Sequence, residues 1–360
     1  MGILRFLLAL SVIVGHSDSG WAFQFLPGDI AVEAFFIISG FYMALVLNEK
    51  YFKVRNYYKI FITNRLLRLY PMYWAVLLII LAICLVNGRL NGQYGNLQVY
   101  LDYWHKLKPG SLAYLITTNI TIVGQDTLFF LTNNHNGGLQ YTANTFSSPL
   151  VLYRFLFDFP VWTVSLEIMF YVISPFFVRM GIKTLTLIAL LLLLARVIVK
   201  LNGVHYDPFI YRFFPLQLVF FLSGIITYQF YNKLKAIEIP KAVSYGCMVY
   251  ILIFTAISGR IVDSEVKDFI YLFSIACVVP VLFKLSRSSK SDRWIGELSY
   301  PMYISHILII LIVRGALQHF HIDGKYSVII VIFVTLCFSI ILLMLIGKRV
   351  EHYRAKRIIR

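Results

Sequence analysis

Three ionisable residues interrupt strongly apolar stretches of this chain, where a charged side chain costs about 2.5–3.5 kcal/mol or more. They are His16 at the end of RFLLALSVIVGH, Glu33 in GDIAVEAFFIISGF and Glu167 in WTVSLEIMFY. A carboxylate beside a histidine fixes the imidazole tautomer and raises its basicity, as base or nucleophilic catalysis requires. The residue types therefore predict a catalytic His16 that is oriented by Glu33 or Glu167. The alternative is that each carboxylate pairs with a buried Arg or Lys and only holds helices together.

Arg5 precedes His16 by eleven residues. On an α-helix these residues rise about 16 Å, roughly half the hydrocarbon thickness of a bilayer. Arg5 is thus expected near the inner boundary, and His16 in the outer half or at its surface. Taken alone, the pair is equally well explained by a snorkelling arginine and an interfacial histidine.

A basic and aromatic cluster occupies the motif NRLLRLYPMYW. Arg65 and Arg68 share one helical face and lie beside Tyr70, Tyr73 and Trp74. Guanidinium groups and aromatic rings suit an anionic ligand that has phosphates and an adenine ring. The alternative is ordinary anchoring of the inner boundary by basic residues and an aromatic belt.

A second histidine, His306, lies in LSYPMYISH, roughly 12 Å from the inner boundary. Tyr300 and Tyr303 precede it on the same predicted helix. The spacing fits a helix-packing group and a channel-lining group equally well.

The elements that must position these residues are membrane-spanning helices. Of the 360 residues, 59% are hydrophobic and only 14% are charged, and the mean hydropathy is +0.75. A soluble domain of this size needs more surface charge, so the composition predicts an all-α polytopic membrane protein. We attribute the net charge of +16 to cytoplasmic loops rather than to nucleic-acid binding. The four cysteines (Cys84, Cys247, Cys277 and Cys337) lie in apolar runs without paired spacing, so neither disulfides nor a metal site are expected.

Ten stretches approach the roughly 20 apolar residues that a helix needs to cross a bilayer. They are about 3–17, 30–48, 71–87, 160–178, 184–201, 209–230, 244–260, 267–284, 298–318 and 326–347. With the N-terminus inside, 22 of the 33 basic residues fall on the cytoplasmic side, which predicts that both termini are cytoplasmic. This topology puts His16, Glu33 and Glu167 at a similar depth. A signal peptide is the alternative for the first stretch, although an A-x-A-like cleavage site is missing.

The one long outer connection covers about 88–159. Parts of it are polar and rich in Gly and Asn, but 111–131 is nearly apolar and contains Gln125 and Asp126. A re-entrant or interfacial piece fits better than a crossing, which would reverse the charge pattern. We therefore expect one membrane domain over 1–347 and a basic cytoplasmic tail over 348–360.

Six motifs, in this order, resemble the acyltransferase-3 family of integral membrane acyltransferases. Arg5-x10-His16 matches the first-helix motif of that family. AVEAFFIISGF is similar to VDLFFVLSGF, RLLRLYPMYW to RRxxRIxPxYW, WTVSLEIMFY to WSLSxEExFY, FFLSGIITY to FxxGxxxY and LSYPMYISH to SYxxYxxH. Glu33 stands where Asp is common. Ile168 and Met169 replace polar residues, so only the first acidic position of that motif, Glu167, carries over.

The resemblance implies a multi-pass O-acyltransferase, usually an O-acetyltransferase, of the cell's inner membrane. Its donor would be cytosolic acetyl-CoA or another acyl-CoA, and its acceptor a sugar hydroxyl of a cell-envelope glycan or lipid-linked sugar at the outer face. The expected site residues are His16, Glu33 and Glu167 for catalysis, Arg5, Arg65, Arg68, Tyr73 and Trp74 for the donor, and Trp162, Ser165, Tyr300 and His306 as further candidates.

Two other functions fit the same residues. A transporter or flippase for lipid-linked glycans would line its path with these charges, and discontinuous helices in paired halves would favour it. A structural subunit of an envelope-synthesis complex would need His16 only for assembly. The sequence specifies neither the acceptor sugar nor the acyl chain, and it does not separate a base from an acyl carrier at His16. It is compatible with a homo-oligomer surrounded by membrane lipid without requiring one.

Overall fold

The chain is described by a computed structural model that covers residues 1–17, 24–203, 207–321 and 327–359. Its α-helices are α1 (Gly2–His16), α2 (Gly28–Glu49), α3 (Tyr57–Asn91), α4 (Gln98–Tyr103), α5 (Pro109–Thr121), α6 (Trp162–Phe177), α7 (Ile182–Leu201), α8 (Phe209–Arg212), α9 (Phe214–Leu234), α10 (Lys241–Ile257), α11 (Glu265–Ser286), α12 (Lys290–Glu297), α13 (Ser299–His319), α14 (Ser327–Leu342) and α15 (Lys348–Ile359). One antiparallel hairpin, β1 (Leu131–Asn133) and β2 (Leu139–Tyr141), pairs Leu131 with Tyr141.

The all-α polytopic architecture is confirmed. Within the described ranges, nine helical stretches are long and apolar enough to cross a membrane. Each of the ten predicted stretches overlaps a helix. The first of these helices, α1, is shorter than the other nine stretches and is not counted among them. Its 15 residues rise about 22 Å, which is less than the roughly 30 Å of bilayer hydrocarbon.

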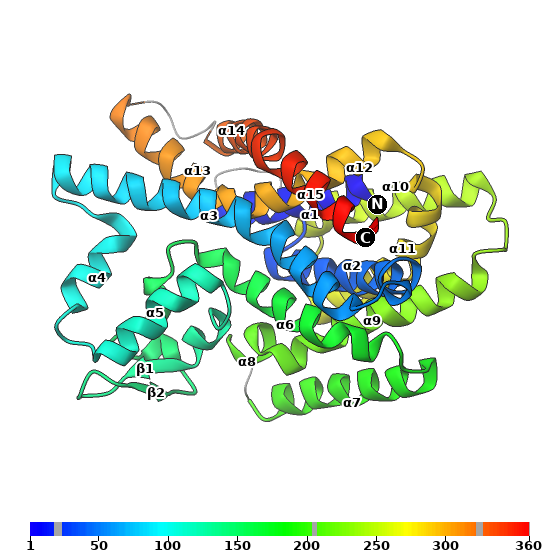
Figure 1. The fold of residues 1–360 in the computed structure, drawn as a ribbon, viewed down its shortest axis with the longest axis horizontal. Coiled ribbons are helices and arrows are strands. Elements are labelled where there is room, and N and C mark those ends of the chain that lie inside the picture. The colour runs from blue at the N-terminus through cyan, green and yellow to red at the C-terminus, as the bar shows by residue number, and fades with distance from the viewer. Residues whose placement is uncertain (18–23, 204–206, 322–326, 360) are drawn as a thin grey trace.

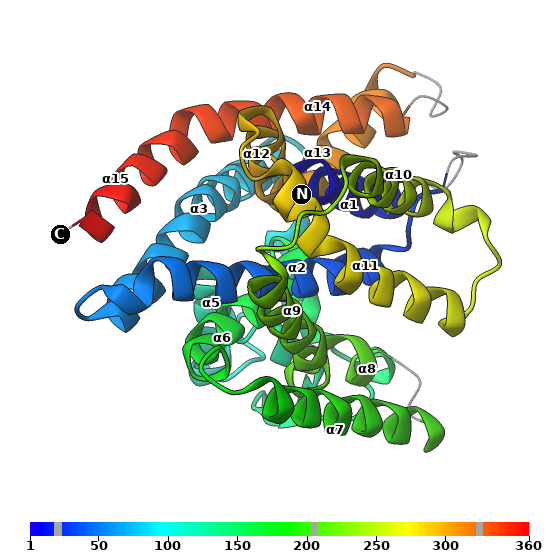
Figure 2. The same ribbon diagram turned by 90° about the vertical axis from the view of Figure 1, so that its right-hand side faces the viewer.

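The short helix α1 lies inside the bundle, where it packs against α2, α10, α12, α13 and α14 (Figure 2). Its first backbone N–H groups are not left unpaired. The carboxylate of Asp292 accepts hydrogen bonds from the N–H of Gly2 (2.8 Å) and of Ile3 (3.0 Å), and a negative charge at this helix end is favourable. The helix that contains Arg5 and His16 is therefore held at its start and along its sides.

Helices α2 and α9 approach one another closely because glycines stand at their crossing. A Cβ atom on Gly40 would lie 2.0 Å from the carbonyl oxygen of Phe221, and one on Gly224 would lie 2.0 Å from that of Ile37. Small residues at such crossings are typical of membrane helix pairs. The contact fixes α2 against α9 and leaves Ser39 to face α6, where it donates a hydrogen bond to Glu167.

The segment between α3 and α6 lies at one end of the bundle, at the left of Figure 1. The end of α5 contacts α3, where carbonyls of the last turn of α5 accept hydrogen bonds from Tyr73 and Trp74. Trp74 precedes the end of α3 by roughly 25 Å of helix. The segment thus contacts the middle of α3, and a re-entrant or interfacial piece over 111–131 stays a prediction.

Candidate active site

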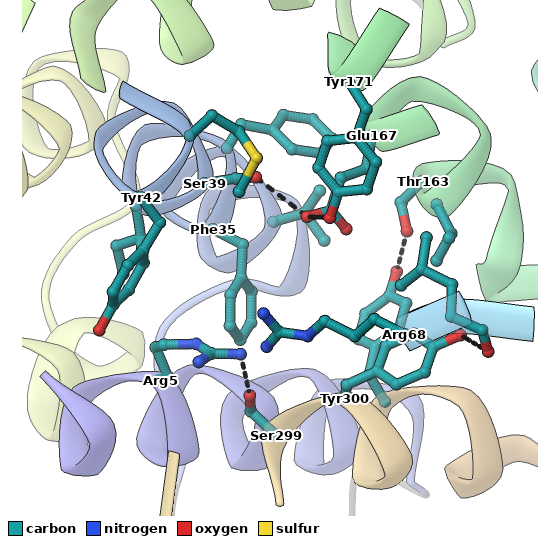
Figure 3. Close-up of a pocket in the computed structure, with 17 residues that line it drawn as sticks. Arg5, Phe35, Ser39, Tyr42, Arg68, Thr163, Glu167, Tyr171, Ser299 and Tyr300 are labelled. Carbon is teal, nitrogen blue, oxygen red and sulfur yellow. Dashed lines mark hydrogen bonds between the residues drawn. The ribbon is translucent and has the colours of Figure 1, made fainter. Parts of the chain in front are cut away.

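Five helices, α1, α2, α3, α6 and α13, enclose a cavity in the middle of the bundle (Figure 3). The empty space between its lining side chains is about 780 Å³, including the part that is open to the surroundings. Apolar side chains of α2 line part of it. The polar lining residues are Arg5, Ser39, Tyr42, Arg68, Thr163, Glu167, Tyr171, Ser299, Tyr300 and Tyr303. Motifs that are far apart in the sequence thus contribute to one site.

Two arginines extend into the cavity from different helices. Arg5 donates a hydrogen bond from Nη2 to the Ser299 hydroxyl at 2.8 Å. Arg68 points toward Arg5 (Figure 3), and no acceptor among the described residues forms a hydrogen bond or ion pair with its guanidinium. Two like charges that face the same partly enclosed space repel one another unless an anion lies between them. The arrangement therefore has the charge and geometry that suit an anionic group.

Glu167 faces the same cavity from α6. Its Oε1 accepts hydrogen bonds from the Ser39 hydroxyl at 2.9 Å and from the Tyr171 hydroxyl at 2.5 Å (Figure 3). Neutral donors therefore orient this carboxylate, and no Lys or Arg of the described residues forms an ion pair with it. Its charge stays available to the contents of the cavity.

His16 lies on the same side of α1 as Arg5, three turns further along. Its Nδ1 contacts the carbonyl oxygen of Val12 at 2.9 Å, and its ring lies 5.0 Å from the ring of His306 on α13, measured between centroids. The side chain of His16 is exposed and that of His306 is fully buried. The orienting contacts of His16 are thus a backbone carbonyl and a second imidazole, where a carboxylate was expected.

Glu33 does not line the cavity. It lies in a buried contact between α2, α7 and α9. It forms an ion pair with Arg196 and accepts a hydrogen bond from Gln217 Nε2 at 3.3 Å. Both partners also donate to the carbonyl oxygen of Ile210 at 2.9 Å. For Glu33 the geometry is that of the second interpretation, in which the carboxylate pairs with a buried arginine and holds helices together.

Three residues of the predicted donor surface have other contacts. Arg65 is buried, lies outside the cavity lining, and places its guanidinium 5.5 Å from the ring centroid of Phe61. Tyr73 donates to the carbonyl of Asn119, and Trp74 Nε1 donates to that of Ile120 at 2.9 Å. The aromatic pair therefore satisfies the last carbonyls of α5, which a helix end leaves without partners. Among the predicted donor residues of this motif, only Arg68 lines the cavity together with Arg5.

Of the remaining candidates, Tyr300 lines the cavity, whereas Trp162, Ser165 and His306 do not. Tyr300 donates to the carbonyl of Leu69 at 2.9 Å. Ser165 donates to Asp126 at 2.7 Å and accepts from the N–H of Gly124 at 3.0 Å, which ties the turn after α5 to α6. Trp162 is buried at the start of α6.

Two buried charged residues near the site, Arg212 and Asp158, were not predicted from the sequence. Arg212 lies with its guanidinium 4.3 Å from the Trp162 ring and pairs with Asp207 at 2.6 Å. Asp158 lies shortly before the start of α6 at Trp162. Both of its carboxylate oxygens are buried without a hydrogen-bond partner among the described residues. Burial raises the pKa of Asp158 well above its ordinary value. Asp158 lies just outside the predicted stretch 160–178 and Arg212 in the first turn of 209–230, so neither interrupts the middle of an apolar run as Glu33 and Glu167 do.

No cluster of three His, Cys, Asp or Glu side chains that could hold a metal ion occurs among the residues with described positions. The groups that can bind a co-substrate are the two arginines and the tyrosines around them. A phosphorylated ligand is compatible with this donor set.

Comparison with known proteins adds independent information. The family model described as an acyltransferase domain matches residues 1–347. The chain is similar to the "Putative acetyltransferase ORF330" of Acidianus two-tailed virus, at 28% identity over 167 residues, which cover 44% of this chain and 51% of the viral protein. It is also similar to an uncharacterized protein of Aquifex aeolicus (strain VF5), at 24% identity over 205 residues, which cover 54% of this chain and 88% of that protein. The match thus spans about half the length of the viral relative. No solved structure matches the chain.

Proposed function

This chain belongs to the acyltransferase-3 family of membrane acyltransferases, and on that premise we propose that it transfers an acyl group from cytosolic acyl-CoA to a sugar hydroxyl of a cell-envelope glycan. Acetyl-CoA is the expected donor. The observation that supports this reaction most strongly is the cavity in which Arg5 and Arg68 face one another, neither of them in an ion pair with a described residue.

In this proposal the two guanidinium groups bind phosphates of CoA at the inner end of the cavity. Phosphates do not enter hydrocarbon cheaply, but the pantetheine arm can extend along the cavity toward Tyr303 and the two histidines. His16 lies about 16 Å beyond Arg5 along α1. That separation lets the charged end of the donor stay at the inner side while the thioester reaches the catalytic histidine.

His16 is proposed to act as the general base. A carbonyl oxygen only accepts hydrogen bonds, so the contact with Val12 requires a proton on Nδ1 and leaves a lone pair on Nε2. Nε2 takes the proton of the acceptor hydroxyl while the hydroxyl oxygen attacks the thioester carbonyl. The CoA thiolate then leaves and takes this proton. A positioned base typically contributes roughly 10²–10⁴-fold to the rate.

Mass analysis of envelope glycans tests the reaction. Cells with the wild-type protein should contain glycan species heavier by one acyl group, and cells without it or with His16→Ala should lack them. The His16→Ala protein should insert and accumulate as the wild type does. Unchanged glycan masses at normal protein levels would contradict acyl transfer, and an altered distribution of unmodified glycan across the membrane would favour a transporter.

A further inference from the structure

The two neighbouring imidazoles are held in matching states. His306 Nδ1 contacts the carbonyl oxygen of Tyr303 at 2.6 Å, as His16 Nδ1 contacts that of Val12. Because each carbonyl can only accept, each Nδ1 carries a proton and each Nε2 presents a lone pair. The helices α1 and α13 thus hold two neutral rings with their centroids 5.0 Å apart and their planes inclined by 52°.

The Nε2 atom of His306 is buried and has no hydrogen-bond partner among the described residues. A buried acceptor without a hydrogen-bond partner is destabilising, so the unpaired Nε2 needs an explanation. The neutral His16 has no Nε2 proton to donate. Once His16 has taken a proton from a substrate, it has one.

The position of His306 also connects it with the cavity. Tyr303, one helical turn earlier, lines the cavity, and its ring centroid lies 5.8 Å from that of His306. The Tyr303 hydroxyl is fixed by the Thr163 hydroxyl at 2.7 Å and the Pro160 carbonyl at 3.1 Å. Neither histidine lines the cavity itself, and the pair is linked to it through Tyr303, the lining residue of α13 that is furthest along the helix from Ser299.

From these contacts we propose that His306 is a positioning residue for the transfer reaction. Its Nε2 is the second acceptor of a three-centre hydrogen bond from Nε2–H of His16, beside the substrate atom that faces this proton, directly or through one water, during the interval in which His16 is cationic. This inference rests on the proposed acyl transfer and names a residue that acts through the base. An interaction that exists only in the charged state lowers the barrier without tightening substrate binding.

The proton balance closes within the two rings and the substrates. The acceptor O–H bond breaks and its proton moves to His16 Nε2, while the new C–O bond forms and the C–S bond of the thioester breaks. The proton then passes from His16 to the CoA thiolate, and the lone pair of His306 loses its donor again. His306 itself ends each cycle neutral and unchanged.

Two amide substitutions separate this role from helix packing. His306→Asn places an amide N–H near the Nδ1 position, so it preserves the bond to the Tyr303 carbonyl but removes the Nε2 acceptor. His306→Gln places an amide oxygen near the Nε2 position and gives up the Nδ1 bond. A packing role favours Asn, whereas the proposed role favours Gln.

The experiment uses membranes that contain the full-length protein, radiolabelled acetyl-CoA, and label in the glycan fraction as the readout. Transfer by the wild type and its loss in His16→Ala establish the reaction first. We then expect His306→Asn to lower kcat by roughly 10- to 100-fold with little change in the KM for acetyl-CoA, and His306→Gln to keep most of the activity. Equal kcat in the two variants, whether both high or both low, would overturn the role of His306 while leaving the proposed function intact.

Discussion

Glu33 and Glu167 are both carboxylates within apolar helices, but their surroundings differ. Glu33 is 3% exposed and forms an ion pair with Arg196. Glu167 is oriented by two hydroxyl groups and faces a cavity that contains two arginines. A charge that already has its partner holds helices together, whereas charges that share an unfilled cavity are available to a ligand. Glu33 therefore belongs to a structural contact between helices, and Glu167 belongs to the candidate active site.

The largest effect on the stability of the fold is expected at the ion pair between Glu33 and Arg196. Removing one member of a buried ion pair leaves the other charge unpaired, which costs about 3–5 kcal/mol. Glu33→Ala and Arg196→Ala should therefore greatly reduce the amount of folded protein in membranes. The double variant Glu33→Leu with Arg196→Met should recover much of it. Normal levels and normal thermal stability of both single variants would remove the distinction between the two glutamates.

Glu167→Gln should give the opposite result. Glutamine can still accept the Ser39 hydrogen bond, so the fold should persist while the negative charge in the cavity is lost. We expect normal protein levels and an acyl-transfer rate lowered by roughly tenfold or more. Loss of folded protein with normal specific activity would instead assign Glu167 to the same structural class as Glu33.

The helices could be predicted because long apolar stretches are a strong and local signal. Arg5, Arg68 and Glu167 could also be predicted as site residues, since each lies in a motif. The side chains that the predicted site residues contact could not be predicted. Arg196 belongs to no motif and meets Glu33 only because α2 and α7 both pack against α9. The burial pattern of one helix does not reveal which side chain of another helix it will contact.

The same limit explains the aromatic residues of α3. Tyr73 and Trp74 are residue types that often line ligand sites. In the structure, the segment between α3 and α6 folds back, and carbonyls of α5 accept their hydrogen bonds. The sequence predicted that 111–131 would be re-entrant or interfacial, and it could not predict the residues that the segment would contact. The histidine pair likewise depends on the side-by-side packing of α1 and α13.

A smaller effect is expected at Asp158, which is a buried carboxyl group without a described partner. Its pKa is raised by burial, so the folded state favours the protonated form. The stability associated with that proton is complete below the unfolded pKa of about 3.9 and is lost as the pH rises through the folded pKa. Asp158→Asn should therefore raise the Tm in detergent at about pH 8 and have little effect near pH 4. A Tm difference that does not depend on pH would contradict a buried, protonated Asp158.

The central claim is that Arg5 and Arg68 bind the donor and that His16 acts on it afterwards. Arg65 is a matched control, because it lies on the same helix as Arg68 but outside the cavity. The direct test is the Kd of acetyl-CoA for purified wild-type protein and for Arg5→Gln, Arg68→Gln, Arg65→Gln and His16→Ala, with the folded fraction measured for each.

Loss of a charge-assisted hydrogen bond to phosphate should weaken binding by about 10- to 100-fold in Arg5→Gln and Arg68→Gln. The Arg65→Gln and His16→Ala proteins should bind within about threefold of the wild type. If His16→Ala loses acetyl-CoA binding while Arg5→Gln and Arg68→Gln retain it, the donor does not bind at the two arginines and the account of this cavity is contradicted.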